Sequence, residues 1–369
     1  MSQSSSDDLS SELGRVAAAA FAREAAQFSE RWQRVVTALD TLKDVEIGAT
    51  PKDEVYREDK VVLYRYRPLP ESKGVRALRT PILICYALVN RPYMMDLQAD
   101  RSLIRGLLRG GADVFLIDWG YPDGSDRYLG MADYVLRYLP HCRDQVRKTT
   151  GASEINLLGV CQGGTLSACY AALHPGEVRN LITMVSPIDF HTPENLLTRW
   201  SEQIDVDLMV DTLGNIPGEL LNQVFVSLMP FRLNSQKYVS LLDSADDAQA
   251  LENFMRMERW IFDSPDQAGE AFREFLNWFI KGNRLVGGTL ELGGRRVDLR
   301  RLTMPIFNLY ASQDHLVPPS AAKALAKHAG TKDYSSYEFP GGHIGIYVSG
   351  TAQREVAPRI AAWLRERDG

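Results

Sequence analysis

The sequence predicts an α/β fold in which a mostly parallel sheet is covered by helices on both faces. The first observation behind this prediction is an apolar strand pattern at 155–158, followed by the pentapeptide 159–163 (Gly-Val-Cys-Gln-Gly) and a helical pattern at 164–173. The other two are strand patterns at 304–310 and 336–339, each followed by a polar side chain suited to catalysis. Catalytic groups of open parallel sheets gather beyond the carboxyl ends of the strands, so these segments indicate one site.

The pentapeptide 159–163 has the pattern Gly-x-nucleophile-x-Gly, which is the sharp strand-to-helix turn of α/β-hydrolases. Glycines suit a turn too tight for larger neighbours, and the free N–H groups of the following helix favour an anion there. Cys161 occupies the nucleophile position, where most hydrolases have Ser, and we expect a lowered pKa for its thiol. On this segment alone, a small buried Cys in a glycine-rich turn remains the alternative.

Two later segments supply the partners that a nucleophilic thiol needs. Asp314 follows the strand at 304–310, and His343 follows the strand at 336–339 after a Pro-Gly-Gly turn. The chain order nucleophile, Asp, His is the order found in α/β-hydrolases, so the prediction is an α/β-hydrolase fold. In this interpretation His343 is the general base and Asp314 fixes its tautomer. His315 competes for the base role and ranks second, because adjacent side chains usually diverge.

The predicted oxyanion donors are backbone N–H groups. Gln162 supplies one, and Asn90, just after the strand pattern at 81–88, supplies the other. An ordinary strand-ending turn is the alternative for Asn90. Asp118 ends the strand pattern at 114–117 near the ligand edge of the sheet, where either a structural role beside the next residue or a catalytic role fits.

The spacing of these elements predicts the domain organisation. The strands at 181–185 and 304–310 are separated by far more chain than a minimal hydrolase needs, and much of the excess is predicted as a cap over the site. Its apolar side chains suit the cap's own helical core, and also a lid that keeps water out. The predicted parts are a disordered N-terminus (1–12), an N-terminal helix (13–45), the first part of the core (46–186), the cap (187–300) and the second part of the core (301–369).

Composition excludes several classes of protein. The net charge of −5 and the pI near 5.8 argue against a nucleic-acid partner. No segment has a signal-peptide pattern or the length of a membrane span, so neither is expected. No metal site or disulfide framework is expected either, and a reduced, cytoplasmic compartment is consistent with the spacing of the four cysteines, Cys85, Cys142, Cys161 and Cys169.

Five segments, read together, resemble the polyhydroxyalkanoate synthases, and the resemblance runs from about residue 41 to the C-terminus. It is weakest between about 205 and 300. The matching segments are Gly-Val-Cys-Gln-Gly-Gly-Thr at 159–165, Leu-Val-Asn-Arg-Pro-Tyr-Met-Met-Asp-Leu-Gln at 88–98, Leu-Ile-Asp-Trp-Gly-Tyr-Pro-Asp at 116–123, Tyr-Ala-Ser-Gln-Asp-His-Leu-Val-Pro-Pro at 310–319 and Gly-Gly-His-Ile-Gly at 341–345.

The resemblance implies a subclass and a reaction. With Cys161 so early, the chain is similar to the short catalytic subunit of the two-subunit class III synthases, which work with a companion subunit. It implies polymerisation of (R)-3-hydroxyacyl-CoA, mainly 3-hydroxybutyryl-CoA, at the surface of cytoplasmic polyester granules. CoA is then the leaving group, no cofactor is implied, and a homo-oligomer is expected. The alternatives are a thioesterase or polyester depolymerase of the same fold, and an inactive granule scaffold.

The N-terminal segment has a helical pattern of its own. A seam of about three heptads leaves two readings open: a helix packed on its own catalytic domain, or one that docks the companion subunit or the granule. The seam residues are Phe21, Ala25, Phe28, Trp32, Val35, Leu39 and Leu42.

Overall fold

The computed structural model divides into two compact units. The larger contains Ile47–Leu228 and Trp260–Gly369, and the smaller contains Met1–Glu46 and Met229–Arg259. The predicted disordered segment 1–12 lies outside the described residues, and the predicted cap at 187–300 remains a prediction. The residues that the structure describes are 19, 21–37, 45–48, 50–228, 241–243 and 246–368.

The larger unit is built on an eight-stranded sheet with the order β1-β2-β6-β3-β7-β8-β11-β12. The β1–β2 and β2–β6 pairs are antiparallel, and every pair from β6 to β12 is parallel. Two small antiparallel pairs, β4–β5 and β9–β10, lie outside it. The strands are β1 (Lys52–Glu58), β2 (Val61–Tyr66), β3 (Ile82–Cys85), β4 (Asp96–Gln98), β5 (Arg101–Ser102), β6 (Val114–Asp118), β7 (Ile155–Val160), β8 (Val178–Met184), β9 (Glu291–Leu292), β10 (Arg295–Arg296), β11 (Ile306–Ala311) and β12 (Tyr334–Phe339).

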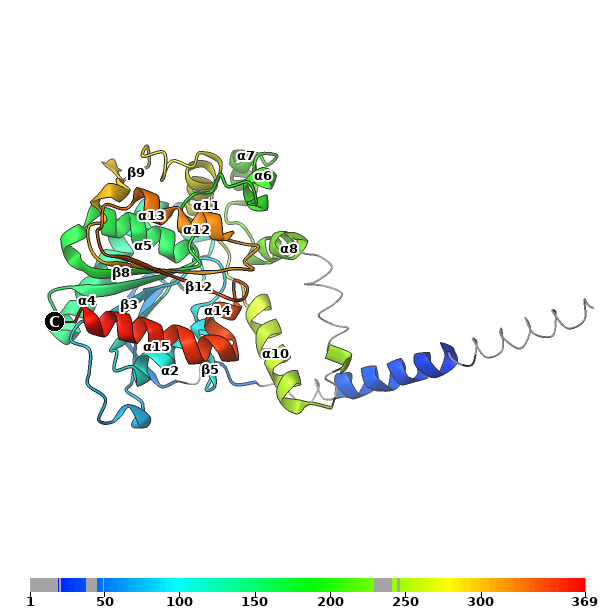
Figure 1. Cartoon of the computed structure of the whole chain (residues 1–369). Helices are drawn as coiled ribbons and strands as arrows, with labels where there is room; N and C mark the ends of the chain where they lie inside the picture. Colours follow the sequence, from blue (N-terminus) through cyan, green and yellow to red (C-terminus); the bar gives the residue numbers. More distant parts are fainter. Residues whose placement is uncertain are drawn as a thin grey trace, which may run out of the picture. The chain divides into compact units, whose positions relative to one another are not determined.

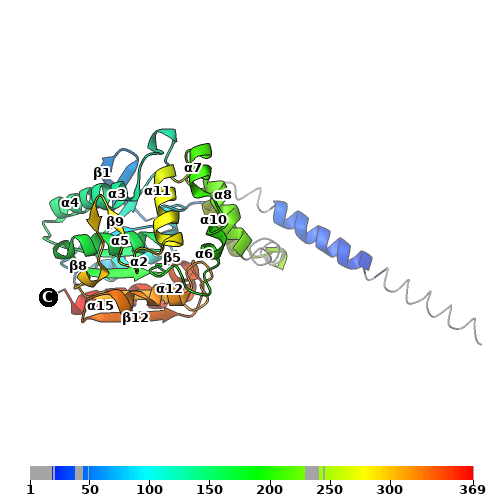
Figure 2. The same cartoon turned by 90° about the horizontal axis from the view of Figure 1, so that it is seen from above.

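Helices cover both faces of this sheet. In Figure 1, α2 and α15 lie below the sheet and α5, α12 and α13 lie above it, and Figure 2 gives the view from above. Short 3₁₀ or π segments are η1 (Pro70–Ser72), η2 (Pro92–Met95), η3 (Gly124–Asp126), η4 (Tyr134–Tyr138), η5 (Pro175–Glu177), η7 (Phe275–Lys281) and η8 (Leu299–Arg301). The α-helices are α2 (Leu103–Arg109), α3 (Met131–Asp133), α4 (Leu139–Thr150), α5 (Gln162–Leu173), α6 (Leu196–Ser201), α7 (Val206–Leu213), α8 (Gly218–Leu228), α10 (Ala248–Phe262), α11 (Gly269–Glu274), α12 (Pro319–Lys323), α13 (Leu325–His328), α14 (Gly345–Val348) and α15 (Gly350–Glu366).

The central strands form because their residues are apolar on both faces. Every residue of β3, β6 and β7 is buried, as expected for parallel strands covered by helices on both sides. In the register, Cys85 lies opposite Gly159 and Val160 lies opposite Met184. The carboxyl ends of β3, β7 and β8 therefore meet at one edge of the sheet.

Most predicted strands are present with shifted ends, and one is much shorter than predicted. The pattern at 81–88 predicted a strand through Leu88, but β3 ends at Cys85. The apolar residues continue to Leu88. This residue is buried, but it no longer pairs with a neighbouring strand. The reason is the hydrogen bonding of its backbone, described with the site below.

The insertion between β8 and β11 contributes to the main core as well as to the smaller unit. Val206 and Val210 of α7 and Phe279 of η7 belong to the same apolar cluster as the central strands. Apolar burial of this kind stabilises the position of α7 and η7 on the core.

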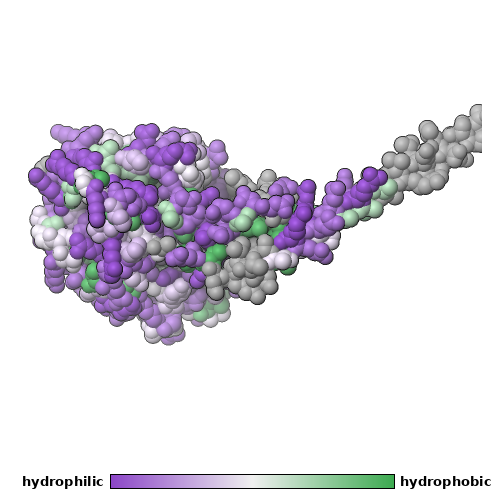
Figure 3. Space-filling view, turned by 90° about the horizontal axis from the view of Figure 1, so that it is seen from below, coloured by the Kyte–Doolittle hydropathy of each residue, from purple (hydrophilic) through white to green (hydrophobic). Residues whose placement is uncertain are grey.

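Hydrophilic residues cover most of the face that Figure 3 shows.

The smaller unit contains a helix at 21–37, within the predicted helix of 13–45. Val35 is fully buried against Leu241, Leu242 and Leu251. Other seam positions are exposed, including Phe21 at 74%. The seam residues Leu39 and Leu42 lie outside the described residues.

Candidate active site

Cys161 lies in the sharp turn between β7 and α5, at the carboxyl edge of the sheet. Its backbone has φ of 53° and ψ of −127°, a conformation that non-glycine residues rarely adopt. Two hydrogen bonds hold it: its N–H donates to the carbonyl of Met184 at 2.9 Å, and its carbonyl accepts from Gly164 at 2.9 Å. Strain at such a position is typical of a functional residue and presents the half-buried thiol above the turn.

Gly163 allows α5 to approach the end of β3 closely. A Cβ at this position would lie 2.2 Å from the carbonyl oxygen of Cys85 and 2.5 Å from that of Tyr86. No side chain fits at such distances without a shift of the backbone. The second glycine of the pentapeptide therefore determines how near the thiol lies to the segment that follows β3.

His343 and Asp314 form a buried pair beside Cys161. The distance from Nδ1 of His343 to Oδ2 of Asp314 is 2.7 Å, and the residues are 5% and 6% exposed. The other carboxylate oxygen accepts hydrogen bonds from the N–H groups of Leu316 and Val317, each at 2.9 Å. The charge and hydrogen bonding of Cys161 also raise the pKa of the His343 imidazole, so the thiol lies close to this ring. The loops after β7, β11 and β12 thus bring the three predicted residues together.

The pKa of His343 depends on a balance between burial and charge. Burial alone would lower this pKa, but the negative charge of Asp314 and the sulfur of Cys161 outweigh it. The net result raises the pKa of His343 to about 10. A raised pKa favours the protonated form of this imidazole at neutral pH.

Gln162 directly follows Cys161 in the chain, and Asn90 lies in the segment after β3. Gln162 begins α5, where its backbone N–H belongs to the first turn and has no helical acceptor. Its side-chain Oε1 accepts from the N–H of Leu88 at 3.1 Å. Asn90 has a left-handed backbone with φ of 61°. The role of Gln162 and Asn90 in binding an oxyanion stays a prediction.

The β3 loop (residues 88–93) is bonded along its length by the stem segment (residues 260–267), which comprises the end of α10 and the chain after it. Sequence reasoning missed this contact, and the only signal was a polar run, Asp-Ser-Pro-Asp-Gln, inside an apolar insertion. The bonds run from Trp260 Nε1 to Arg91 O (2.8 Å), from Tyr93 Oη to Asp263 Oδ2 (3.0 Å), from Ser264 Oγ to Asn90 Oδ1, and from Gln267 Nε2 to Leu88 O (2.8 Å).

The two secondary candidates, Asp118 and His315, lie in surroundings that differ from those of the Cys161 thiol. Asp118 forms a buried ion pair with Arg91 at 2.6 Å and accepts from the N–H of Gly120 at 2.9 Å. These bonds join the end of β6 to the β3 loop, so Asp118 has a structural role. His315 lines a cavity of about 320 Å³ together with Glu194 and with Asp314 itself. The Asp314 carboxylate bonds to His343, the residue ranked first for the base role.

Comparison with known proteins identifies the family. The α/β hydrolase fold family matches residues 80–349. The poly(3-hydroxyalkanoate) polymerase subunit PhaC of Allochromatium vinosum is 54% identical over 348 residues, which cover 94% of this chain and 97% of that one. The protein of the same name from Synechocystis is 50% identical over 353 residues, with 93% and 92% covered. The chain belongs to the PhaC family of poly(3-hydroxyalkanoate) polymerase subunits.

Solved structures agree with the hydrolase fold of this PhaC family member. A thermostable carboxyl esterase from Bacillus coagulans superimposes with a TM-score of 0.58 at 15% identity, covering 87% of this chain and 99% of that one. At such low identity the likeness concerns the fold alone. In the part of the chain that the structure describes, no helix is both long and apolar enough to span a membrane.

Proposed function

We propose that this PhaC family member polymerises (R)-3-hydroxyacyl-CoA, mainly 3-hydroxybutyryl-CoA, to polyhydroxyalkanoate and releases CoA. The observation that carries the proposal is a thiol, Cys161, on a strained hydrolase turn beside the buried pair of His343 and Asp314. A thiolate suits a thioester substrate, because it displaces a thiolate of similar leaving ability. Membership of the PhaC family supports the polymerase reaction over hydrolysis.

The first half of the reaction transfers the acyl group to Cys161. The thiolate attacks the thioester carbonyl, a C–S bond forms, and the carbonyl electrons move to the oxygen. When the tetrahedral intermediate collapses, the bond to CoA breaks. The protonated His343 donates its proton to the departing CoA thiolate, so the products are acyl-Cys161, neutral His343 and CoA. The raised pKa of His343 supports this sequence, since its proton is present at the start.

The second half extends the polyester. The 3-hydroxyl of another hydroxyacyl unit loses its proton to neutral His343 while its oxygen attacks the acyl-Cys161 carbonyl. An ester bond forms, the C–S bond breaks, and the Cys161 thiolate and protonated His343 return. Asp314 orients the imidazole for both transfers. The N–H groups of Gln162 and of Asn90 stabilise the oxyanion in each half.

The proposal includes a setting for the enzyme. A companion subunit of the two-subunit class, a homo-oligomeric assembly and a cytoplasmic location at the polyester granule surface are parts of it. The relatives are named polymerase subunits, which supports assembly with another chain. No metal or organic cofactor is required by the chemistry, because CoA enters with the substrate and leaves as product.

The test is CoA release from (R)-3-hydroxybutyryl-CoA, with the acyl product analysed alongside. It compares the wild type with Cys161→Ala, with and without a companion subunit. We expect release with polymer in the wild type, a further rise with the companion, and loss of both release and thiol labelling at this site in Cys161→Ala. Free 3-hydroxybutyrate as the product would instead favour a thioesterase, and no release with a companion present would favour an inactive scaffold.

A further inference from the structure

The backbone of Leu88 is held on both sides by glutamine side chains. Gln162 accepts its N–H at 3.1 Å, and Gln267 donates to its carbonyl at 2.8 Å. All three residues are less than 10% exposed, so water does not compete with these bonds. This peptide has left the sheet ladder, and the two side chains replace the bonds that a neighbouring strand would supply.

Gln267 is itself rigidly placed. Its N–H donates to the carbonyl of Ile216 and its carbonyl accepts from the N–H of the same residue, both at 2.9 Å. Ile216 is fully buried in the main core. The amide group that bonds Leu88 therefore projects from a fixed, two-bond bridge within the insertion.

The position of Leu88 determines where the next two backbone amides lie. Among the described residues, none accepts a hydrogen bond from the N–H of Val89 or of Asn90. Asn90 is in the left-handed region and its side chain bonds to Ser264, next to the same bridge. An unpaired N–H that follows the contact of Leu88 with Gln162, the neighbour of Cys161, is suited to an oxyanion, and it must be aimed at that oxygen within a fraction of an ångström.

We propose that Gln267 is a positioning residue, which aims the amides after Leu88 at the substrate oxyanion from within the insertion. It acts through the backbone of Leu88 and touches neither the substrate nor Cys161. The proposal deepens the proposed function, because it rests on acyl transfer at Cys161. In this proposal the stem segment contributes to the site and also forms the base of the insertion.

The first variant, Gln267→Met, keeps the size of the side chain but removes its N–H donor. The rate of Cys161 acylation by 4-nitrophenyl butyrate is measured from the burst of 4-nitrophenolate. We expect the maximal acylation rate to fall by about 10- to 100-fold, the range that a misplacement of about 1 Å produces. The KM and the rate of Cys161 alkylation by iodoacetamide stay unchanged, since alkylation makes no oxyanion.

The second variant, Gln267→Glu, gives the proposal a signature that a purely structural role would not produce. An ionised carboxylate accepts hydrogen bonds only, whereas a protonated carboxyl donates one. The ratio of variant to wild-type acylation rate should therefore rise as the pH falls. A ratio that does not change with pH would overturn the proposal.

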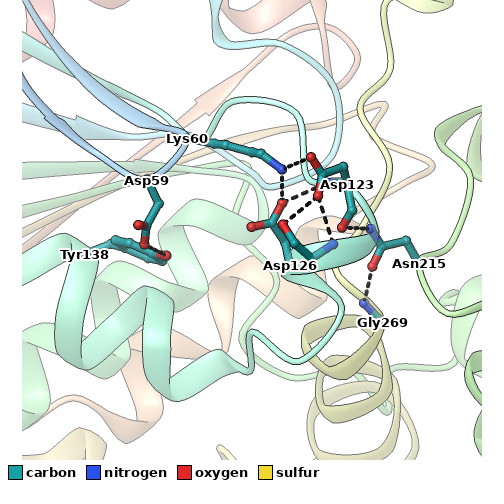
Figure 4. Close-up of polar contacts among 8 residues, drawn as sticks. Asp59, Lys60, Asp123, Asp126, Tyr138, Asn215 and Gly269 are labelled. Carbon is teal, nitrogen blue, oxygen red and sulfur yellow. Dashed lines mark hydrogen bonds and ion pairs between the residues drawn. The ribbon is translucent and has the colours of Figure 1, made fainter.

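The matched control is Asn215→Ala, at the other side of the same bridge. Asn215 donates to the carbonyl of Asp123 at 2.7 Å and accepts from the N–H of Gly269 at 3.2 Å, away from Leu88 (Figure 4). We expect its acylation rate to match the wild type. An equal loss in Asn215→Ala, or no loss in Gln267→Met, would refute the positioning role. The ester carries neither CoA nor a 3-hydroxyl, so this result is independent of whether the CoA-release test succeeds.

Discussion

Three hydrogen bonds hold the Asp314 carboxylate in place. Two backbone amides, of Leu316 and Val317, fix one oxygen, and the other is left for His343. Bonds from backbone amides to a carboxylate are strong and short, so the carboxylate does not rotate. The ring of His343 is consequently held with Nδ1 toward Asp314 and its other nitrogen toward Cys161.

The first prediction concerns the change Asp314→Asn. Loss of the negative charge should lower the pKa of His343 from about 10, because burial then has less to oppose it. The turnover number should fall by about 10⁴-fold, the size of loss that a triad carboxylate shows when it is replaced by an amide. NMR titration of the imidazole and CoA-release kinetics measure the two effects. Asp298→Asn, at a carboxylate that bonds to Arg300, is the control.

An unchanged titration of His343 in Asp314→Asn, at full or reduced turnover, would contradict this account. It would mean that the pKa of His343 is governed by groups other than Asp314.

The residues that meet at the candidate site could be predicted from sequence, whereas the residues that bond to the β3 loop could not. Cys161 and His343 each sit in a local pattern, a strand followed by a glycine-rich turn, which a single sequence displays. Gln267 bonds to Leu88 across 179 positions of the chain, and nothing near either residue indicates the other. Local spacing encodes turns and strand ends, but a side-chain contact at that separation depends on how the insertion folds back.

The turn between β7 and α5 is an element in which glycine positions determine packing. Each strand end near it was predicted within a few residues, except that of β3. An apolar run cannot reveal where a strand leaves its ladder, because burial continues after the pairing ends. The bonds of Gln162 and Gln267 to Leu88 hold the chain after β3 outside the ladder, and both glutamines lie outside the apolar run.

The second prediction concerns the change Gly163→Ala in this element. The added methyl group would lie 2.2 Å from the Cys85 carbonyl, so either α5 or the end of β3 must shift. Overpacking of this kind costs about 1–3 kcal/mol of the free energy of unfolding, which urea denaturation measures. Gly176→Ala is the matched control, because a Cβ there meets nothing within 4 Å.

A Gly163→Ala protein as stable as the control would contradict the expected loss of free energy of unfolding, but would not by itself decide whether α5 shifts. Acylation of Cys161 gives a second readout, since a shift of α5 moves the thiol relative to the β3 loop. Loss of acylation at full stability would still agree with the close approach, whereas full stability and full acylation together would refute it.

The whole molecule combines a hydrolase sheet with an insertion that is divided between two compact units. The fold of the larger unit follows from the strand patterns, because six of its strands are parallel and all of these except the edge strand β12 are largely buried. The helix at 21–37 could also be predicted from its heptad spacing, but its contacts could not. Val35 packs on Leu241 and Leu251, which come from the insertion, and a seam pattern does not say which partner it meets.

The last prediction concerns the pH dependence of the stability of the whole chain. The pKa of His343 is raised from 6.5 to about 10 on folding, so the folded state binds more protons than the unfolded state between these values. The stabilisation is fully present below pH 6.5 and is lost as the pH rises toward 10. Relative to His343→Gln, the wild type should lose free energy of unfolding between pH 6.5 and 9.5, measured by urea denaturation. Groups that do not interact with His343 cancel in the comparison, so parallel curves would mean that His343 is not held protonated by Asp314 and Cys161.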